Sequence, residues 1–244
     1  MFERTMLRIG AVALAAGLIT AVVFEVLHPA REDPNDNPRV FAEYAGSGNW
    51  TTIHLGALAG ALMLLGGLVA LSESLRDGPA VQTAWARLAA ASAVVAAAAY
   101  GVLQVVDGVA LKHAVDAWAA APSDTKTAAF AAAESVRWIE YGLNSLTFSF
   151  VGLTLILLGV ALLTGDRFPR WQGVWAVAAG LAYLVRGLLV AYHGFAANPF
   201  GLVALILFGS WVLVMAASMW RRGSRLNQEP DTTRPHETAR PVGT

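Results

Sequence analysis

The sequence contains no cysteine, and lysine occurs only at Lys112 and Lys126. Without cysteine there are no disulfides, thiolate metal ligands, iron–sulfur clusters or cysteine nucleophiles. Charged residues make up 14% of the chain, against about 25% in an average soluble domain. The net charge is zero, so no basic surface for nucleic acid is expected, and nucleic-acid binding is excluded.

Apolar sequence dominates what remains. Hydrophobic residues account for 56% of the chain, and the mean hydropathy is +0.54. A bilayer core about 30 Å thick is crossed by about 20 apolar residues in a helix. Six segments reach that length: residues 7–28, 51–71, 85–107, 138–163, 171–193 and 200–220.

These segments predict the fold. Lipid offers no hydrogen bonds to the backbone, so each segment must be helical. We expect an all-α polytopic membrane bundle over residues 1–222, with six transmembrane helices and a disordered tail over residues 223–244. The first segment exceeds the roughly 7–15 apolar residues of a signal peptide, which favours a retained helix.

The positions of the basic residues predict the orientation. Arginines gather in the N-terminal segment, in alternate connections (Arg76, Arg167) and after the last span (Arg225). The positive-inside rule places this side, with both termini, in the cytoplasm. The tryptophans fit two interfaces: Trp85, Trp171 and Trp220 at the inner one, Trp50 and Trp138 at the outer one.

Two outer connections are long enough to form structure. Residues 29–49 contain Asp33-Pro34-Asn35-Asp36-Asn37-Pro38, which reads as a turn-rich loop. Residues 108–136 are alanine-rich, and their sequence predicts that the third and fourth helices project beyond the bilayer as a hairpin.

Ionisable side chains recur near the outer ends of five spans. An intramembrane charge costs about 2.5–3.5 kcal/mol even on insertion scales, so such groups face a partner or a cavity. They predict a polar pocket near the outer leaflet that binds a small ligand or ion. The candidate ligand-binding residues are Glu25, Asp107, Arg137, Glu140 and Arg186.

Arg186 lies deepest, about two helical turns from the outer end of its span. A guanidinium at that depth needs an anionic partner. We expect Asp107 or Glu140 to pair with it, or else Glu25 or a bound ligand. Arg137 has carboxylates one turn away, at Glu134 and Glu140.

A divalent metal is an alternative occupant. Imidazole and carboxylate ligands suit zinc, iron or manganese. The candidate metal ligands are His54, His193, Asp107 and Glu140. Glu25 and His28 have the Glu-x-x-His spacing of di-iron helices, but a di-iron bundle needs this motif twice and the sequence contains it once. Haem held by a pair of histidines is a further alternative.

Two further functions stay open. A buried carboxylic acid with a raised pKa could perform acid–base chemistry on a lipid-like substrate. The same residues also suit a structural or regulatory membrane protein, because the ends of spans are normally polar.

Four segments carry a resemblance: Leu27-His28-Pro29, Trp50 to His54, Val106 to Lys112 and Ala133 to Trp138. They resemble uncharacterised multi-pass membrane proteins of actinobacteria, and the likeness runs from the first span to the sixth. The resemblance implies a bacterial cytoplasmic membrane and no particular activity. The preference for arginine over lysine and the abundance of alanine also indicate a bacterial source.

The predicted orientation can be tested with reporter fusions. Fusions after Arg76, Arg167 and Arg225 should all report a cytoplasmic location, because each follows a basic inner connection. A periplasmic signal from any one of them would contradict the topology.

Overall fold

The computed structural model describes residues 2–195 and 199–226, and these residues form helices and connections without strands. The tail was expected to begin at residue 223, but residues 223–225 belong to the last helix, and residues 227–244 lie outside the described residues. The helices are α1 (Phe2–Leu27), α2 (Asn37–Ala45), α3 (Trp50–Ser74), α4 (Ala80–Val105), the π-helix η1 (Val106–Leu111), α5 (Lys112–Ala120), α6 (Lys126–Leu163), α7 (Arg170–His193) and α8 (Pro199–Arg225).

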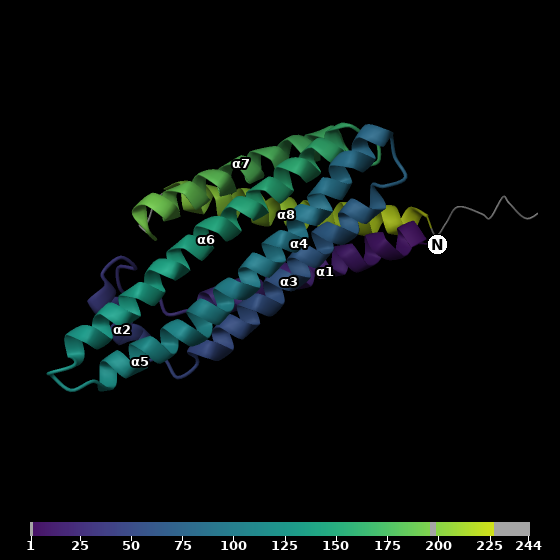
Figure 1. Cartoon of the computed structure of the whole chain (residues 1–244). Coiled ribbons are helices and arrows are strands. Elements are labelled where there is room, and N and C mark those ends of the chain that lie inside the picture. The colour runs from purple at the N-terminus through teal and green to yellow at the C-terminus, as the bar shows by residue number, and fades with distance from the viewer. Residues whose placement is uncertain (1, 196–198, 227–244) are drawn as a thin grey trace, which may run out of the picture.

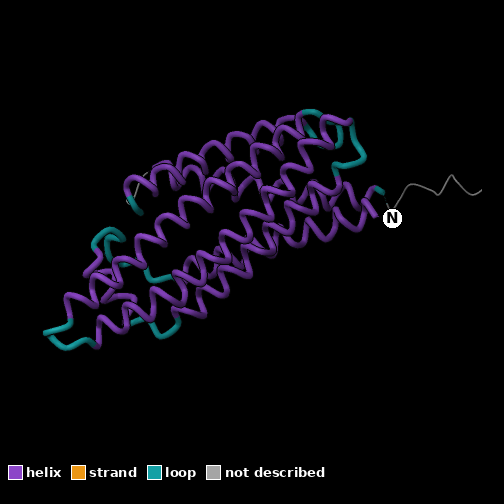
Figure 2. Tube along the Cα trace, in the orientation of Figure 1, coloured by secondary structure: helices purple, strands orange, loops and turns teal. Residues whose placement is uncertain are grey.

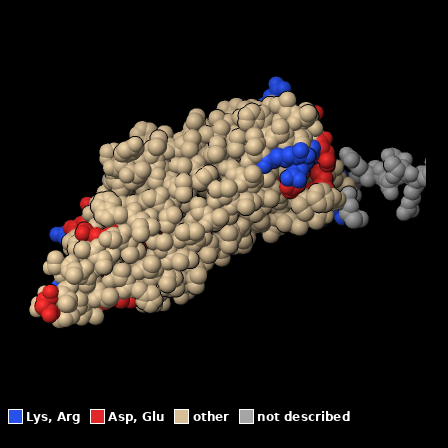
Figure 3. Space-filling model, viewed as in Figure 1, with Lys and Arg blue, Asp and Glu red and all other residues tan. Residues whose placement is uncertain are grey.

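All six predicted spans are confirmed as long apolar helices. Five are single helices, and the third joins α4, η1 and α5 into one stretch from Ala80 to Ala120. Large apolar side chains such as Ile9, Leu88 and Leu202 are exposed along the sides of the bundle. Figure 3 shows a broad surface without charge between two charged ends. The chain is therefore a multi-pass membrane protein.

The spanning helices form a closed ring. Each packs on two others, in the order α1, α3, α4, α6, α7, α8 and back to α1. Figures 1 and 2 show the helices running side by side along one long axis. The end with the start of α1 and the end of α8 is called the arginine-rich end, and the opposite end, with α2 and α5, is called the hairpin end.

The ring is filled by apolar side chains toward the arginine-rich end. Leucines from α1, α3 and α6 and small residues from α4 and α7 form one buried cluster, completed by Trp211 and Met215 of α8. Trp211 also donates its indole N–H to the carbonyl of Gln172 at 2.9 Å, which joins α8 to α7. This half of the ring is tightly packed.

Glycines allow the closest helix contacts. A Cβ on Gly180 of α7 would lie 2.6 Å from the carbonyl oxygen of Gly152 on α6, and a Cβ on Gly60 of α3 would lie 2.7 Å from the backbone nitrogen of Ala21. Gly60 thus allows α3 to approach α1 closely, whereas Gly66 faces open space.

The first outer connection contains a helix that the sequence reading missed. Residues 29–49 were expected to be a loop, but α2 occupies Asn37–Ala45. Asp36 caps it by accepting a hydrogen bond from the N–H of Arg39, and a proline stands in the first turn. Val40, Phe41 and Tyr44 pack this helix on α5, which explains why a helix only nine residues long is ordered.

The third and fourth spans are extended by a helical hairpin made of α5 and the start of α6. The stretches Ala80–Ala120 and Lys126–Leu163 contain 41 and 38 residues, roughly twice the number needed to span a bilayer. Figure 1 shows α5 and the start of α6 extending past the other helices. Trp138 and Trp171 are exposed as interface anchors would be, whereas Trp50, expected at the outer interface, is buried within the protein.

The glycine contact between α6 and α7 yields a stability prediction. Gly180→Ala should lower the melting temperature, because two of the three atoms nearest to its added Cβ, the carbonyl oxygen of Gly152 and the backbone nitrogen of Ile156, are backbone atoms that cannot move aside. Gly101→Ala is the matched control, since nothing lies within 4 Å of its added Cβ. Equal melting temperatures for these two variants would contradict the tight α6–α7 contact.

Candidate functional site

The sequence-predicted polar residues lie at the hairpin end, but they do not form one cluster. Two buried pairs account for most of them. His54 of α3 pairs with Asp107 of η1, and Arg137 pairs with Glu140 within α6. Glu25, Arg186 and His193 lie outside these pairs.

The His54–Asp107 pair joins α3 to the third span. The Nε2 atom of His54 lies 3.1 Å from Oδ2 of Asp107, and its Nδ1 lies 2.8 Å from the carbonyl oxygen of Trp50. His54 is only 4% exposed. The imidazole is therefore held at both nitrogens, and its orientation is set by the first turn of α3.

The π-helix explains how the two helices come so close. Trp50 donates its indole N–H to the carbonyl of Asp107 at 2.9 Å, and Thr51 donates to the carbonyl of Gly108 at 2.9 Å. A Cβ on Gly108 would lie 2.6 Å from the Cβ of His54. The π-helical turn thus places the carbonyls of Asp107 and Gly108 where side chains of α3 donate to them. Gly108 has no side chain, which leaves space for His54. Such π-helical turns occur frequently at functional sites.

His28 completes this cluster at the end of α1. Its ring centre lies 5.2 Å from that of His54 and 5.0 Å from that of Trp50. Burial lowers the pKa of His28 below its ordinary value, and neighbouring His54 lowers it further, while Asp107 and Glu25 act in the opposite direction.

Arg137 and Glu140 form a buried ion pair, one of the two local pairs that the sequence offered. The Nη1 atom of Arg137 lies 2.6 Å from Oε2 of Glu140, and each residue is 2% exposed. Arg137 also donates to the carbonyl of Pro34 at 3.1 Å. Its guanidinium lies 5.0 Å from the ring of Tyr141 and 5.5 Å from that of Tyr44. Burial raises the pKa of Tyr44, so it remains a neutral phenol.

The first outer connection is tied to the end of α7 through Asn35. Its amide donates to the carbonyl of His193 at 3.1 Å, and its side-chain oxygen accepts from the N–H of Phe195 at 3.0 Å. The hydroxyl of Tyr141 donates to the Pro34 carbonyl at 3.2 Å. These hydrogen bonds, called the clasp below, connect residues 34 and 35 to α6 and to the end of α7.

Arg186 departs from the sequence expectation. The expected pairing with Asp107 or Glu140 is wrong, because those carboxylates are engaged by His54 and Arg137. Arg186 instead lies over the ring of Phe148 of α6, with its Cζ 4.2 Å from the ring centre. Among the described residues it has no ion pair.

Glu25 is also without an ion pair in the described part of the chain, and its side chain is exposed. It lies near enough to Tyr100 of α4 and Tyr183 of α7 to act on both electrostatically. Arg186 acts on Tyr183 as well. Tyr183 in turn contacts Phe148 and Phe208, with ring centres 6.0 and 5.2 Å away.

The proposed metal ligands are not brought together. His54 and Asp107 are in contact, but Glu140 binds Arg137, and the side chain of His193 is exposed. Across residues 2–195 and 199–226, no group of three or more histidine, aspartate or glutamate residues is placed to hold a metal ion.

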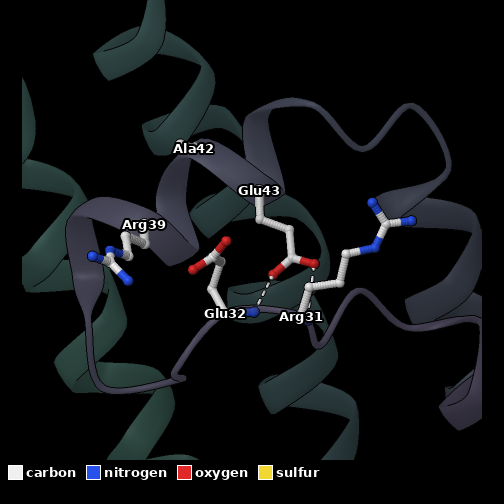
Figure 4. Close-up of a pocket in the computed structure, with 5 residues that line it drawn as sticks. All are labelled: Arg31, Glu32, Arg39, Ala42 and Glu43. Carbon is white, nitrogen blue, oxygen red and sulfur yellow. Dashed lines mark hydrogen bonds between the residues drawn. The ribbon is translucent and has the colours of Figure 1, made fainter.

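An open hollow of about 330 Å³ lies on the outer surface beside α2. Figure 4 shows Glu43 accepting hydrogen bonds from the backbone of Arg31 and Glu32 within it. Arg39 and Ala42 complete its lining. None of the sequence-predicted ligand-binding residues lines this hollow.

Several residues of the site were missed from the sequence. Asn35 and Pro34 were read as turn residues, and Trp50 as a lipid anchor. Nothing in the sequence indicated that Phe148 contacts Arg186, because aromatic residues are common in membrane spans. Gly108 stood in a resembling segment, yet only the packing of His54 reveals its role.

The buried pair in α6 yields a prediction. Arg137→Leu should lower the free energy of unfolding by about 3–5 kcal/mol, because Glu140 is left buried without its partner. Adding Glu140→Leu should restore part of that loss. Arg76→Leu is the control, since it breaks an exposed pair worth about 0–1 kcal/mol. Similar chemical melts for Arg137→Leu and Arg76→Leu would contradict the pair's role.

Comparison with known proteins gives a family and no activity. No curated protein and no solved structure matches the chain. One family model, described as a domain of unknown function (DUF4386), matches residues 9–217, which run from the first span into the sixth. The chain therefore belongs to the DUF4386 family of membrane proteins.

Proposed function

We propose that this protein binds a small molecule inside the helix ring at the hairpin end, with Arg186 holding an anionic group of that molecule. The observation that carries the proposal is a guanidinium within a membrane span that has no carboxylate partner among the described residues. Following the arginine distribution, we place this chamber toward the outer leaflet of a bacterial cytoplasmic membrane.

The direction of Glu25 supports an interior chamber. On α1, Ala21 lies against Gly60 of α3, and Leu18 lies near Gly209 of α8. Glu25 follows these residues by about one and two helical turns, so it lies on the face between them. That face points into the ring, because α3 and α8 are the two neighbours of α1.

Tyr100 and Arg186 lie on corresponding faces of their helices. Tyr100 stands two turns after Ala93, and Arg186 two turns after Ala179, and both alanines belong to the buried core. The stripes that fill the ring with small apolar residues toward the arginine-rich end therefore continue as polar residues toward the hairpin end.

Electrostatic contacts across the ring support the same arrangement. Glu25, Tyr100 and Tyr183 stand on α1, α4 and α7, which are alternate members of the ring and not neighbours. Glu25 nevertheless acts on both tyrosines. We infer that its exposed carboxylate faces a shared interior space and not the lipid.

The charge of Arg186 then requires compensation. A cation between spans is costly unless an anion or water accompanies it. Stacking on Phe148 covers one face of the guanidinium and supplies no counter-charge. A bound anionic group would supply it through charge-assisted hydrogen bonds.

Asp107, Arg137 and Glu140 take a different role in this proposal. Each is already paired with a neighbouring side chain, so we assign them to holding α3, η1, α6 and residue 34 in place. The metal and acid–base alternatives have less support, because the same pairs occupy the residues that those reactions would use.

Thermal unfolding of the purified protein would test the proposal. The panel comprises water-soluble carboxylates from acetate to hexanoate, plain and amino-substituted. At least one should stabilise the wild type, by about 2.7 kcal/mol at a hundred times its Kd. Arg186→Leu should abolish that stabilisation, and without ligand it should unfold no earlier than the wild type, because it removes an uncompensated charge.

Arg87→Leu serves as the control, since Arg87 is an exposed arginine on α4 near the arginine-rich end. It should respond to the panel as the wild type does. The proposal fails if no compound stabilises the wild type, or if Arg186→Leu is stabilised equally.

A further inference from the structure

We propose that the ligand is a compact zwitterion, an ammonium group joined to a carboxylate, held between Glu25 and Arg186. This inference rests on the proposed function and adds the chemical class of the molecule. Its basis is that Glu25 and Arg186 carry opposite charges on helix faces directed toward the ring interior and form no ion pair among the described residues. Arg186 also lies over the ring of Phe148.

Arg186 is arranged for a planar anion. Its Cζ lies over the ring of Phe148, 4.2 Å from the ring centre. A guanidinium carries parallel N–H donors that match the two oxygens of a carboxylate. The phenol of Tyr183, on the same face one turn earlier, adds a donor beside it.

Glu25 is arranged for a cation. Its carboxylate is exposed within the proposed chamber and acts on the phenols of Tyr100 and Tyr183. An ammonium group beside Glu25 would therefore meet a carboxylate and two aromatic rings, the combination that recognises amines in proteins.

Charge balance favours a zwitterion over a simple anion. His54 pairs with Asp107 and Arg137 pairs with Glu140, which leaves Glu25 and Arg186 as one negative and one positive side chain without an ion pair among the described residues. A simple carboxylate would neutralise Arg186 and leave Glu25 uncompensated. A zwitterion complements both charges at once.

The packing favours a free solute over a lipid headgroup. Toward the arginine-rich end the ring is filled by core leucines, alanines and Trp211, which leaves no path for acyl chains along the axis. The helices also close on one another around the ring. A phosphatidylethanolamine headgroup has similar chemistry, but its tails would have to pass between two packed helices.

The test measures binding to wild-type protein in phosphatidylglycerol nanodiscs by titration calorimetry. The probes are ω-amino carboxylates from glycine to 6-aminohexanoate, with plain carboxylates and plain amines of equal chain length. One amino carboxylate should bind at least about tenfold more tightly than its matched carboxylate, a difference of about 1.4 kcal/mol. The best chain length would report the spacing of the two charges.

Variants separate the two groups. Glu25→Gln should remove the advantage of the amino group and keep carboxylate binding, whereas Arg186→Leu should abolish binding of both. Glu73→Gln, at the arginine-rich end, is the matched control and should keep the wild-type preference.

The possible failures are distinguishable. If plain carboxylates bind as tightly as every amino carboxylate, and only with Arg186 present, the zwitterion inference is overturned and the proposed function stands. If no probe binds in an Arg186-dependent way, both are overturned. Binding that disappears in phosphatidylethanolamine nanodiscs would overturn the assignment to a free solute and identify the headgroup as the occupant.

Discussion

Lipid cannot hydrogen-bond or solvate a charge, and the organisation of this protein depends on that constraint. The backbone meets it by forming helices along the whole membrane-crossing length. The side chains meet it in pairs: His54 with Asp107, and Arg137 with Glu140. Each pair is made between residues on one helix or on adjacent helices, so the polar groups also hold the hairpin end together.

The two ends of the ring are built differently. Toward the arginine-rich end, glycine and alanine allow close helix contacts, and leucine fills the interior. Toward the hairpin end, the same interior-facing stripes carry Tyr100, Tyr183 and Arg186, and α2 and the clasp through Asn35 stand over them. A packed half thus supports a polar half, which is a suitable arrangement for a site that must keep its shape while accepting a ligand.

The polar residues of the hairpin end divide into two sets with separate roles. The paired residues are engaged with each other, although Oδ1 of Asp107 and Nε of Arg137 are buried without a hydrogen-bond partner. Glu25 and Arg186 keep their charges available, and they lie on helices that do not pack against each other. We therefore propose that Glu25 and Arg186 recognise the ligand and that the buried pairs hold the surrounding helices in place.

The sequence by itself determined the class of fold, because span length and hydropathy follow from the bilayer thickness and need no knowledge of packing. It also located the level at which the ionisable residues lie, and it offered the local pair of Arg137 with Glu140, since helical spacing alone brings them together. The partners of Asp107 and Arg186 were decided only by the tertiary structure. Helix rotation and the π-helical turn bring Asp107 to His54, and the α6–α7 contact places Arg186 over Phe148. Periodicity specifies the face on which a residue lies, whereas the identity of the helix opposite that face depends on how the whole ring closes.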